Sequence, residues 1–215
     1  AGGVGGEGAG RVVGLVEVED HAAVGVGLGG VEEAAAAVGL GAVGLVAEDD
    51  EVLVVAPRQD VEAMADNEID ICFFNGAIRT AENEHLAHLL RRKSKVMVAF
   101  GSCAYEGCIP ALANLFDAKS IMKRVYETVP TVDGSAGTFP TEVTQVPEGE
   151  IYLPEFYDQV KTLAQTVDVD YYMPGCPPVV EQVWKVLNVI LEGKLPPKGS
   201  VIGVDPKTNC DECPR

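Results

Sequence analysis

Two cysteines follow short apolar runs that end in tight loops. Cys103 lies in Gly-Ser-Cys-Ala (101–104) after the run 96–100, and Cys176 lies in Pro-Gly-Cys-Pro-Pro (174–178) after the run 169–173. Apolar runs of this length that end near glycine are typical of buried strands entering loops. Because the carboxyl ends of parallel strands meet at one edge of a sheet, both thiols are expected at a common metal or cluster site. The structural alternative is two free cysteines that pack as small apolar residues.

Two further cysteines form a C-x-x-C pair, Cys210 and Cys213, in a tail rich in Pro, Lys and Gly. That spacing occurs in zinc sites, iron–sulfur sites and redox dithiols. A redox dithiol normally begins a helix after a strand, and the irregular tail argues against that use. The pair therefore indicates metal or cluster binding.

The loop after Cys103 holds two more candidates. Cys108, five residues further on, is either an additional ligand or a replacement of a small loop residue. Glu106 either shapes the proton or cluster environment or is a solvated carboxylate. Cys72 lies within an apolar run, so it is expected in the core. No nucleophile–base pair and no phosphate-binding glycine loop is visible, so no catalytic residue is predicted.

The elements that position these thiols follow from hydrophobic patterning. Residues 69–74 form a continuous apolar run, residues 81–92 an amphipathic helix, and residues 96–100 a second apolar run. This order predicts a βαβ unit with a parallel sheet. The expected downstream elements are a partly helical segment 111–128, a long loop 130–149, a helix from 153 to about 166, a strand 169–173 and a helix 179–192.

The segment 1–63 differs in composition from the rest of the chain. It uses ten amino-acid types only, all of which can be encoded by codons that begin with G or C, and it holds 14 of the 24 glycines. We expect this segment to be out-of-frame or misassigned sequence; the alternative is a natural low-complexity segment. The predicted domains are therefore the anomalous segment 1–63, an α/β domain 64–193 and a metal-binding tail 194–215.

Composition also limits the partners and the location. The formal net charge of -17 argues against nucleic acid, whose binding requires clustered Lys and Arg. No run reaches the ~18 to 20 apolar residues of a membrane span. Six cysteines without a visible secretion signal predict a reducing compartment, the cytoplasm.

Several motifs occur together in the order of one family. The chain resembles the small (gamma) subunit of nickel–iron hydrogenases, and most closely the F420-non-reducing, methyl-viologen-reducing type associated with heterodisulfide reductase. The twenty-kilodalton subunit of complex I is a more distant relative that shares the Gly-Ser-Cys and Pro-Gly-Cys-Pro-Pro motifs. The segments that carry the resemblance are 101–104, 153–157, 167–178 and 210–215.

The resemblance implies a flavodoxin-like α/β fold, with a parallel sheet, helices on both faces and an irregular cluster-binding C-terminal tail. Cys103 and Cys176 match two ligands of a proximal [4Fe–4S] cluster. Cys210 and Cys213 match the first ligands of a further cluster, whose remaining ligands are expected in a truncated region beyond Arg215. The other two proximal ligands would belong to an N-terminal C-x-x-C loop, but residues 1–63 contain no cysteine.

The function implied by the resemblance is electron relay by an oxidoreductase subunit. Hydrogen would be oxidised at a nickel–iron centre in a partner large subunit, and electrons would pass through [4Fe–4S] clusters to an iron–sulfur or flavin acceptor such as heterodisulfide reductase. One alternative is a twenty-kilodalton subunit of the complex I type, without nickel. Another is a non-catalytic module in which zinc is held by the four cysteines that the motifs contain.

Overall fold

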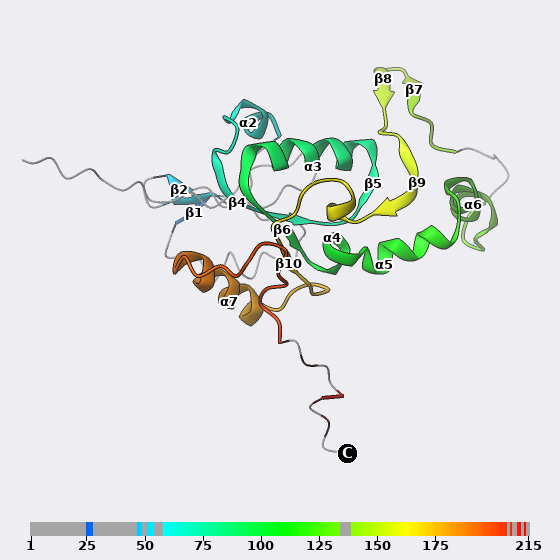
Figure 1. Cartoon of the computed structure of the whole chain (residues 1–215). Helices are drawn as coiled ribbons and strands as arrows, with labels where there is room; N and C mark the ends of the chain where they lie inside the picture. Colours follow the sequence, from blue (N-terminus) through cyan, green and yellow to red (C-terminus); the bar gives the residue numbers. More distant parts are fainter. Residues whose placement is uncertain are drawn as a thin grey trace, which may run out of the picture.

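A computed structural model describes residues 25–27, 47–48, 51–53, 58–133 and 139–205, together with 207, 210–211 and 213 (Figure 1). Near the N-terminus it contains a small antiparallel sheet in the order β1-β3-β2, with β1 (Gly25–Gly27), β2 (Ala47–Glu48) and β3 (Glu51–Leu53). Helix α2 (Arg58–Ala63) follows. Most of the anomalous segment 1–63 lies outside the described residues, so its predicted origin remains a hypothesis.

The principal sheet is parallel and has the order β10-β6-β4. Strand β4 (Ile69–Asn75) pairs with β6 (Ser94–Phe100), and β6 pairs with β10 (Tyr171–Met173). Helix α3 (Ala81–Lys93) connects β4 to β6 (Figure 1). The predicted βαβ unit and the predicted fold class, a flavodoxin-like α/β fold, are confirmed.

Alternate residues of the strands supply two cores. On one face, Cys72 and Met97 pack with Leu86 and Leu90 of α3 in a core that includes thirteen buried residues. On the other face, strand residues such as Phe73 pack with α7 (Val180–Leu191). Burial of both faces explains why β4 and β6 are nearly continuous apolar runs rather than alternating ones. Cys72 is fully buried, as predicted.

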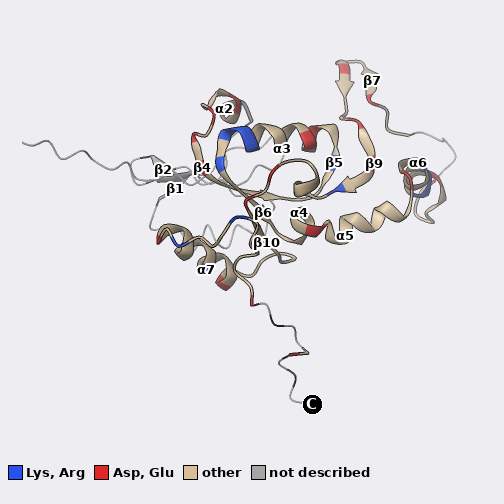
Figure 2. Cartoon of the chain, viewed as in Figure 1, with Lys and Arg blue, Asp and Glu red and all other residues tan. Residues whose placement is uncertain are grey.

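Helix α3 begins and ends with matched local signals. Thr80 caps its N-terminus, since its hydroxyl accepts from the Asn83 N–H while the Asn83 side chain accepts from the Thr80 N–H. Glu82 and Glu84 lie in the first turn, whereas three basic residues lie in the last turn (Figure 2). This charge order complements the helix dipole.

A series of short helical turns follows β6 and leads away from the sheet. Its first element is α4 (Ser102–Glu106). The next four are α5 (Cys108–Ala111), the 3-10 helix η3 (Leu112–Leu115), α6 (Ala118–Lys123) and the π-helical turn η4 (Arg124–Thr128). The prediction of a partly helical segment is confirmed. We call residues 108–128 the apolar arm, because their exposed surface carries many large apolar side chains.

Two predicted elements differ from the structure. The helix expected from residue 153 is wrong: β9 (Phe156–Lys161) pairs antiparallel with β5 (Ile78–Thr80), and the 3-10 turn η6 (Leu163–Gln165) follows. Aromatic and β-branched residues favour the strand, and the edge offered by β5 satisfies its backbone. The expected loop 130–149 contains β7 (Val143–Val146), which forms a hairpin with β8 (Gly149–Tyr152). Residues 134–138 of that loop lie outside the described part.

The helix predicted near residues 179–192 is confirmed as α7. Within the described residues, no helix has the length and apolar character needed to span a membrane.

Candidate metal centre

The loops after β6 and β10 are joined at the carboxyl edge of the sheet. The Gly101 N–H donates to the Met173 carbonyl at 2.7 Å, and the Ser102 N–H donates to the Gly175 carbonyl at 2.8 Å. The Gly175 N–H in turn donates to Ser102 Oγ at 3.0 Å. These three hydrogen bonds fix one loop against the other, so the two sequence motifs form a single structural unit.

Two glycines allow this close approach. Gly101 has φ +84°, and a Cβ there would lie 3.3 Å from Asn75 Oδ1 and 3.4 Å from the Gly175 carbonyl oxygen. Gly175 has φ +147°, and a Cβ there would lie 2.4 Å from the Pro178 Cα. Such backbone angles and such spacing exclude side chains. The two glycines therefore allow the loops to pack directly against each other.

Three thiols gather around this edge. Cys103 is half-buried in α4, Cys108 is half-buried at the start of α5, and Cys176 is exposed. Burial raises the pKa of the Cys103 thiol, and the nearby Cys108 and Cys176 raise it further. A raised pKa favours the neutral thiol, whereas binding a metal or a cluster would require Cys103 as the thiolate.

The predicted site residues are thus brought together in part. Cys103 and Cys176 share the edge, as expected, and Cys108 joins them. Glu106 lies at the end of α4 and is exposed. Cys210 and Cys213 are exposed in the tail, where the Cys213 N–H donates to the Cys210 carbonyl at 3.4 Å.

Helix α4 is held in place by packing on the sheet. Ala104 is fully buried, and the Tyr105 ring lies 4.9 Å from the Tyr172 ring of β10, measured between centroids. Gly107 ends the helix with φ +84°, and its N–H donates to the Cys103 carbonyl. The packing of α4 on the sheet and the end of α4 at Gly107 therefore hold Cys103 in position.

Sequence reasoning missed two residues that support the site. Gln182 of α7 is buried, and its amide Nε2 donates to the Pro174 carbonyl at 2.6 Å. Asp170 accepts from the Met97 N–H and forms ion pairs with Arg91 at 2.7 Å and Lys198 at 2.5 Å. A signal existed in each case, since each is a polar residue within an apolar pattern.

The side chains at this edge are cysteine thiols, which are the type of ligand that iron–sulfur clusters use. Among the described residues, no three His, Cys, Asp or Glu side chains converge on a single ion. A [4Fe–4S] cluster has four thiolate ligands for four irons, so its ligands need not point at a single ion. The described residues offer three thiols at this edge, Cys103, Cys108 and Cys176, which is one fewer than such a cluster uses.

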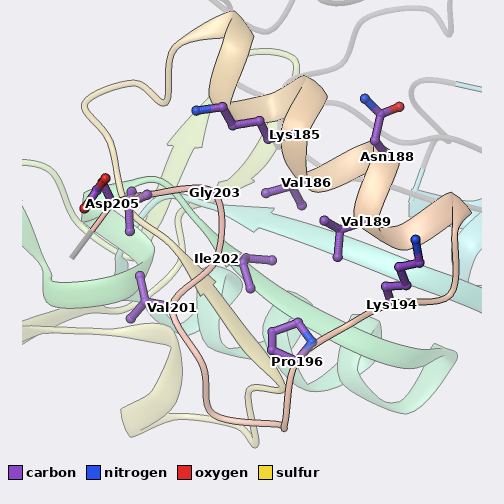
Figure 3. A pocket seen from close by; sticks show the side chains of 11 residues that line it. Lys185, Val186, Asn188, Val189, Lys194, Pro196, Val201, Ile202, Gly203 and Asp205 are labelled. Atoms are coloured by element: carbon purple, nitrogen blue, oxygen red, sulfur yellow. The ribbon is translucent and has the colours of Figure 1, made fainter.

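The concave surface beside α7 is a different feature. It is an open groove of about 650 Å³ with a floor that includes Val186, Val189 and Ile202, and with Lys185 and Asp205 among its polar lining residues (Figure 3). None of the cysteines lines this groove. It therefore does not belong to the thiol site.

Comparison with known proteins identifies the class. The family model described as "NADH ubiquinone oxidoreductase, 20 Kd subunit" matches residues 34–190. The chain therefore belongs to this family. The match begins within the compositionally anomalous segment.

Individual relatives narrow the comparison to hydrogenase subunits. The chain is 42% identical over 157 residues to the F420-non-reducing hydrogenase iron-sulfur subunit of Archaeoglobus profundus, covering 73% of this chain and 49% of that protein. It is 38% identical to the F420-non-reducing hydrogenase vhu subunit of Methanococcus voltae, covering 69% and 46%. These matches confirm the resemblance to a hydrogenase small subunit. The chain spans about half the length of these curated relatives.

A solved structure supports the fold. A chain in the crystal structure of NAD+-reducing [NiFe]-hydrogenase in the H2-reduced state superposes with a TM-score of 0.52 at 30% identity. The superposition covers 62% of this chain and 70% of that one.

Proposed function

We propose that this chain is the electron-transferring small subunit of a nickel–iron hydrogenase, with Cys103 and Cys176 as ligands of a proximal [4Fe–4S] cluster. The observation that carries the proposal is the joining of the two cysteine loops by three hydrogen bonds at one edge of the sheet. The similarity to an iron-sulfur subunit of a hydrogenase supports the same assignment.

In this function the residues of this chain would bind the cluster and orient it. Cys103 and Cys176 would hold the cluster as thiolates, and Gly101 and Gly175 allow the two loops that carry them to pack together. When bound, the cluster supplies one-electron transfer. No proton donor or acceptor of this chain is needed for that step, which agrees with the absence of a predicted catalytic residue.

The partner that supplies electrons is proposed to dock on the apolar arm. Four exposed side chains of the arm lie within eight residues after Cys108: Ile109, Leu112, Leu115 and Phe116. Residues 108–116 include no charged side chain, whereas charged residues of both signs lie in the following segment around α6 (Figure 2). An exposed apolar surface of this kind is typical of protein interfaces. The proposed partner is the nickel–iron large subunit, in which hydrogen is oxidised.

The exit of electrons is assigned to the tail. Cys210 and Cys213 are proposed as ligands of a further [4Fe–4S] cluster, with a heterodisulfide-reductase-type subunit as acceptor. Both thiols are exposed, so they are accessible to a cluster. None of the six cysteines is in a disulfide in the described part of the chain, which supports a reducing compartment, the cytoplasm, as the location.

The experiment that tests this function measures iron and sulfide in the intact complex. Cys103→Ala and Cys176→Ala should each lower the iron content by about one cluster and remove its electron paramagnetic resonance (EPR) signal. Cys72→Ala is the matched control, because Cys72 is buried in β4 away from the site. Zinc without iron or sulfide in the unmodified complex would instead establish the zinc-stabilised module.

Peptide mapping of the subunit from its native complex tests the segment before Met64. We propose that peptides with a C-x-x-C loop replace the sequence given for residues 1–63, which would complete the four thiolates of the proximal site. Peptides that match the given sequence would contradict the frame-error hypothesis. They would leave the cluster with at most three thiolates of this chain near the sheet edge.

A further inference from the structure

The groove beside α7 lies next to an edge of the principal sheet. Residues 200–202 continue the sheet beyond β10, because Val201 bridges Tyr172 in parallel. The Tyr172 N–H donates to the Ser200 carbonyl at 3.1 Å, and the Ile202 N–H donates to the Tyr172 carbonyl at 2.8 Å. Successive residues of a strand direct their backbone groups to opposite sides, so the N–H and the carbonyl of Val201 point away from β10.

The outward backbone groups of Val201 are unpaired. Neither its N–H nor its carbonyl has a hydrogen-bond partner among the described residues. The residue is 41% exposed, and it lines the groove together with Gly203 and Val204. A strand with free N–H and carbonyl groups at a sheet edge is a template for one more strand. The groove therefore borders an edge to which an extended chain can hydrogen-bond.

Helix α7 forms the opposite wall of this groove. Its side chains Val186 and Val189 extend toward the segment that carries Ile202 (Figure 3). Gly203, at φ +79°, lets that segment approach the helix, since a Cβ there would lie 2.8 Å from Val186 Cγ2. The volume of about 650 Å³ is within the usual range for ligand sites. A groove between a sheet edge and a helix is the geometry in which peptides bind by adding a strand.

The charges around the groove favour an acidic ligand. Two lysines and one carboxylate line it, Lys185, Lys194 and Asp205, in a chain whose formal net charge is -17. Lys194 is paired with Glu192 at 2.8 Å. Lys185 is exposed and has no ion pair within the described part of the chain. Its ammonium group is therefore available to an acidic side chain of a ligand.

We propose that this groove binds an extended peptide segment of another protein. The segment adds as a strand beside Val201, packs apolar side chains on Val186 and Val189, and pairs an acidic side chain with Lys185. This function does not depend on the cluster or on the docking of the large subunit, because neither a cysteine nor a residue of the apolar arm lines the groove.

The test titrates the full-length subunit into a fluorescently labelled hexapeptide, Glu-Val-Thr-Val-Thr-Val, and follows fluorescence anisotropy. The hexapeptide should bind, and Lys185→Glu should weaken its binding about 10-fold. A hexapeptide with Lys in place of its Glu should bind Lys185→Glu better than it binds the unmodified subunit. Lys123→Glu is the matched control, because Lys123 of α6 is exposed outside the groove, and it should leave binding unchanged.

Pairing with the sheet edge is tested on the peptide itself, so that the protein is not altered. Two hexapeptides are methylated on alternate backbone nitrogens, one on the odd and one on the even positions. Only one of the two sets of N–H groups can face Val201, so one peptide should lose binding and the other should keep it. Equal effects of the two methylation patterns would overturn the proposal. Failure of the unmodified hexapeptide to bind, or equal loss in Lys185→Glu and Lys123→Glu, would also overturn it.

Discussion

The parallel sheet is covered by other elements of this chain, whereas the apolar arm leaves its apolar side chains exposed. The sheet is buried on both faces by residues of this chain, with α3 on one side and α7 on the other. The arm contributes no buried residue from α5, η3, α6 or η4. Leu115 and Phe116 of the arm are 77% and 63% exposed. The arm is attached to β9 by polar contacts, such as those of the Asn114 amide with Val160.

Charged groups also differ between the two regions: among the described residues, they are paired near the sheet, and one is unpaired beside β9. Near the sheet, the Asp170 side chain is 9% exposed and is paired with Arg91, Lys198 and the Met97 N–H. Beside β9, the three guanidinium nitrogens of Arg79 are buried and have no hydrogen-bond partner among the described residues. The guanidinium lies 4.3 Å from the centre of the Phe156 ring.

The difference indicates which part of the molecule is complete by itself. The sheet positions the thiols with contacts that lie within this chain, so the candidate metal centre does not depend on a partner for its geometry. The arm exposes several large apolar side chains, among them Ile109, Leu112 and Leu115, which is a feature of protein interfaces. Under the proposed function a partner covers the arm, whereas the sheet is covered by this chain.

The substitution that should destabilise the sheet region most is Gly175→Ala. The added Cβ would lie 2.4 Å from the Pro178 Cα, at φ +147°. We expect the free energy of unfolding to fall by about 4 kcal/mol, from backbone strain and overpacking together. Urea denaturation measures this, and iron analysis should show loss of the proximal cluster.

Gly149→Ala is the matched control for that change. Gly149 has a similar φ of +141°, but nothing lies within 4 Å of its Cβ position. It should lose only the strain contribution, about 1 to 2 kcal/mol, and keep its iron. Equal losses in the two variants would contradict the role of close approach at the sheet edge.

Asp170→Asn should have the next largest effect. The substitution removes the charge that two cations share, so the free energy of unfolding at pH 7 should fall by about 2 to 3 kcal/mol. Denaturant titrations of both proteins give this difference directly. A loss no larger than that of an ordinary exposed ion pair, below about 0.5 kcal/mol, would show that these ion pairs do not stabilise the sheet.

The same pair of proteins should show a defined pH dependence. Burial alone would raise the pKa of Asp170, but hydrogen bonds from Lys198, the Met97 N–H and Arg91 outweigh it and hold the pKa below its ordinary value. A carboxyl with a lowered pKa contributes its stability above its unfolded pKa of about 4, and loses it as the pH falls through the folded value. The difference between wild type and Asp170→Asn should therefore be constant from pH 5 to 8 and shrink below pH 4.

The sequence predicted the sheet better than it predicted the arm and β9. Continuous apolar runs identified β4 and β6, because strands buried on both faces leave that pattern. The Gly-Ser-Cys and Pro-Gly-Cys motifs located the thiol edge, because glycine with positive φ is needed where two loops approach. These signals are local, so they can be read without the tertiary structure.

The errors occur where pairing with a distant segment decides the structure. Phe156 to Lys161 became a strand because β5, which lies far earlier in the chain, offers an edge, and no local pattern records that. Gln182 and Asp170 each interrupt an apolar pattern, but the sequence does not show which groups they bind, because those partners come from other elements.

Arg79→Met tests the unpartnered charge beside the arm. Burial lowers the pKa of Arg79, and the nearby Asp158 carboxylate raises it in part. Replacing an unpaired buried cation by an apolar side chain of similar length should raise the free energy of unfolding by about 1 kcal/mol, after loss of the contact with Phe156. Arg79→Lys keeps the charge and should show no gain. Destabilisation by Arg79→Met in denaturant titrations would mean that the charge is satisfied within the chain.

Leu115→Ser should have the smallest effect on stability and a large effect on assembly. Because Leu115 is 77% exposed, the free energy of unfolding should change by less than about 0.5 kcal/mol. Association with the large subunit, measured by co-purification and by binding titration, should weaken more than 10-fold if Leu115 lies at the centre of the interface. Leu191→Ser is the matched control, because Leu191 of α7 is 75% exposed outside the arm and should leave association unchanged. Equal weakening by both substitutions would show that the arm is not the specific docking surface, and the contrast between arm and sheet would then lose its functional meaning.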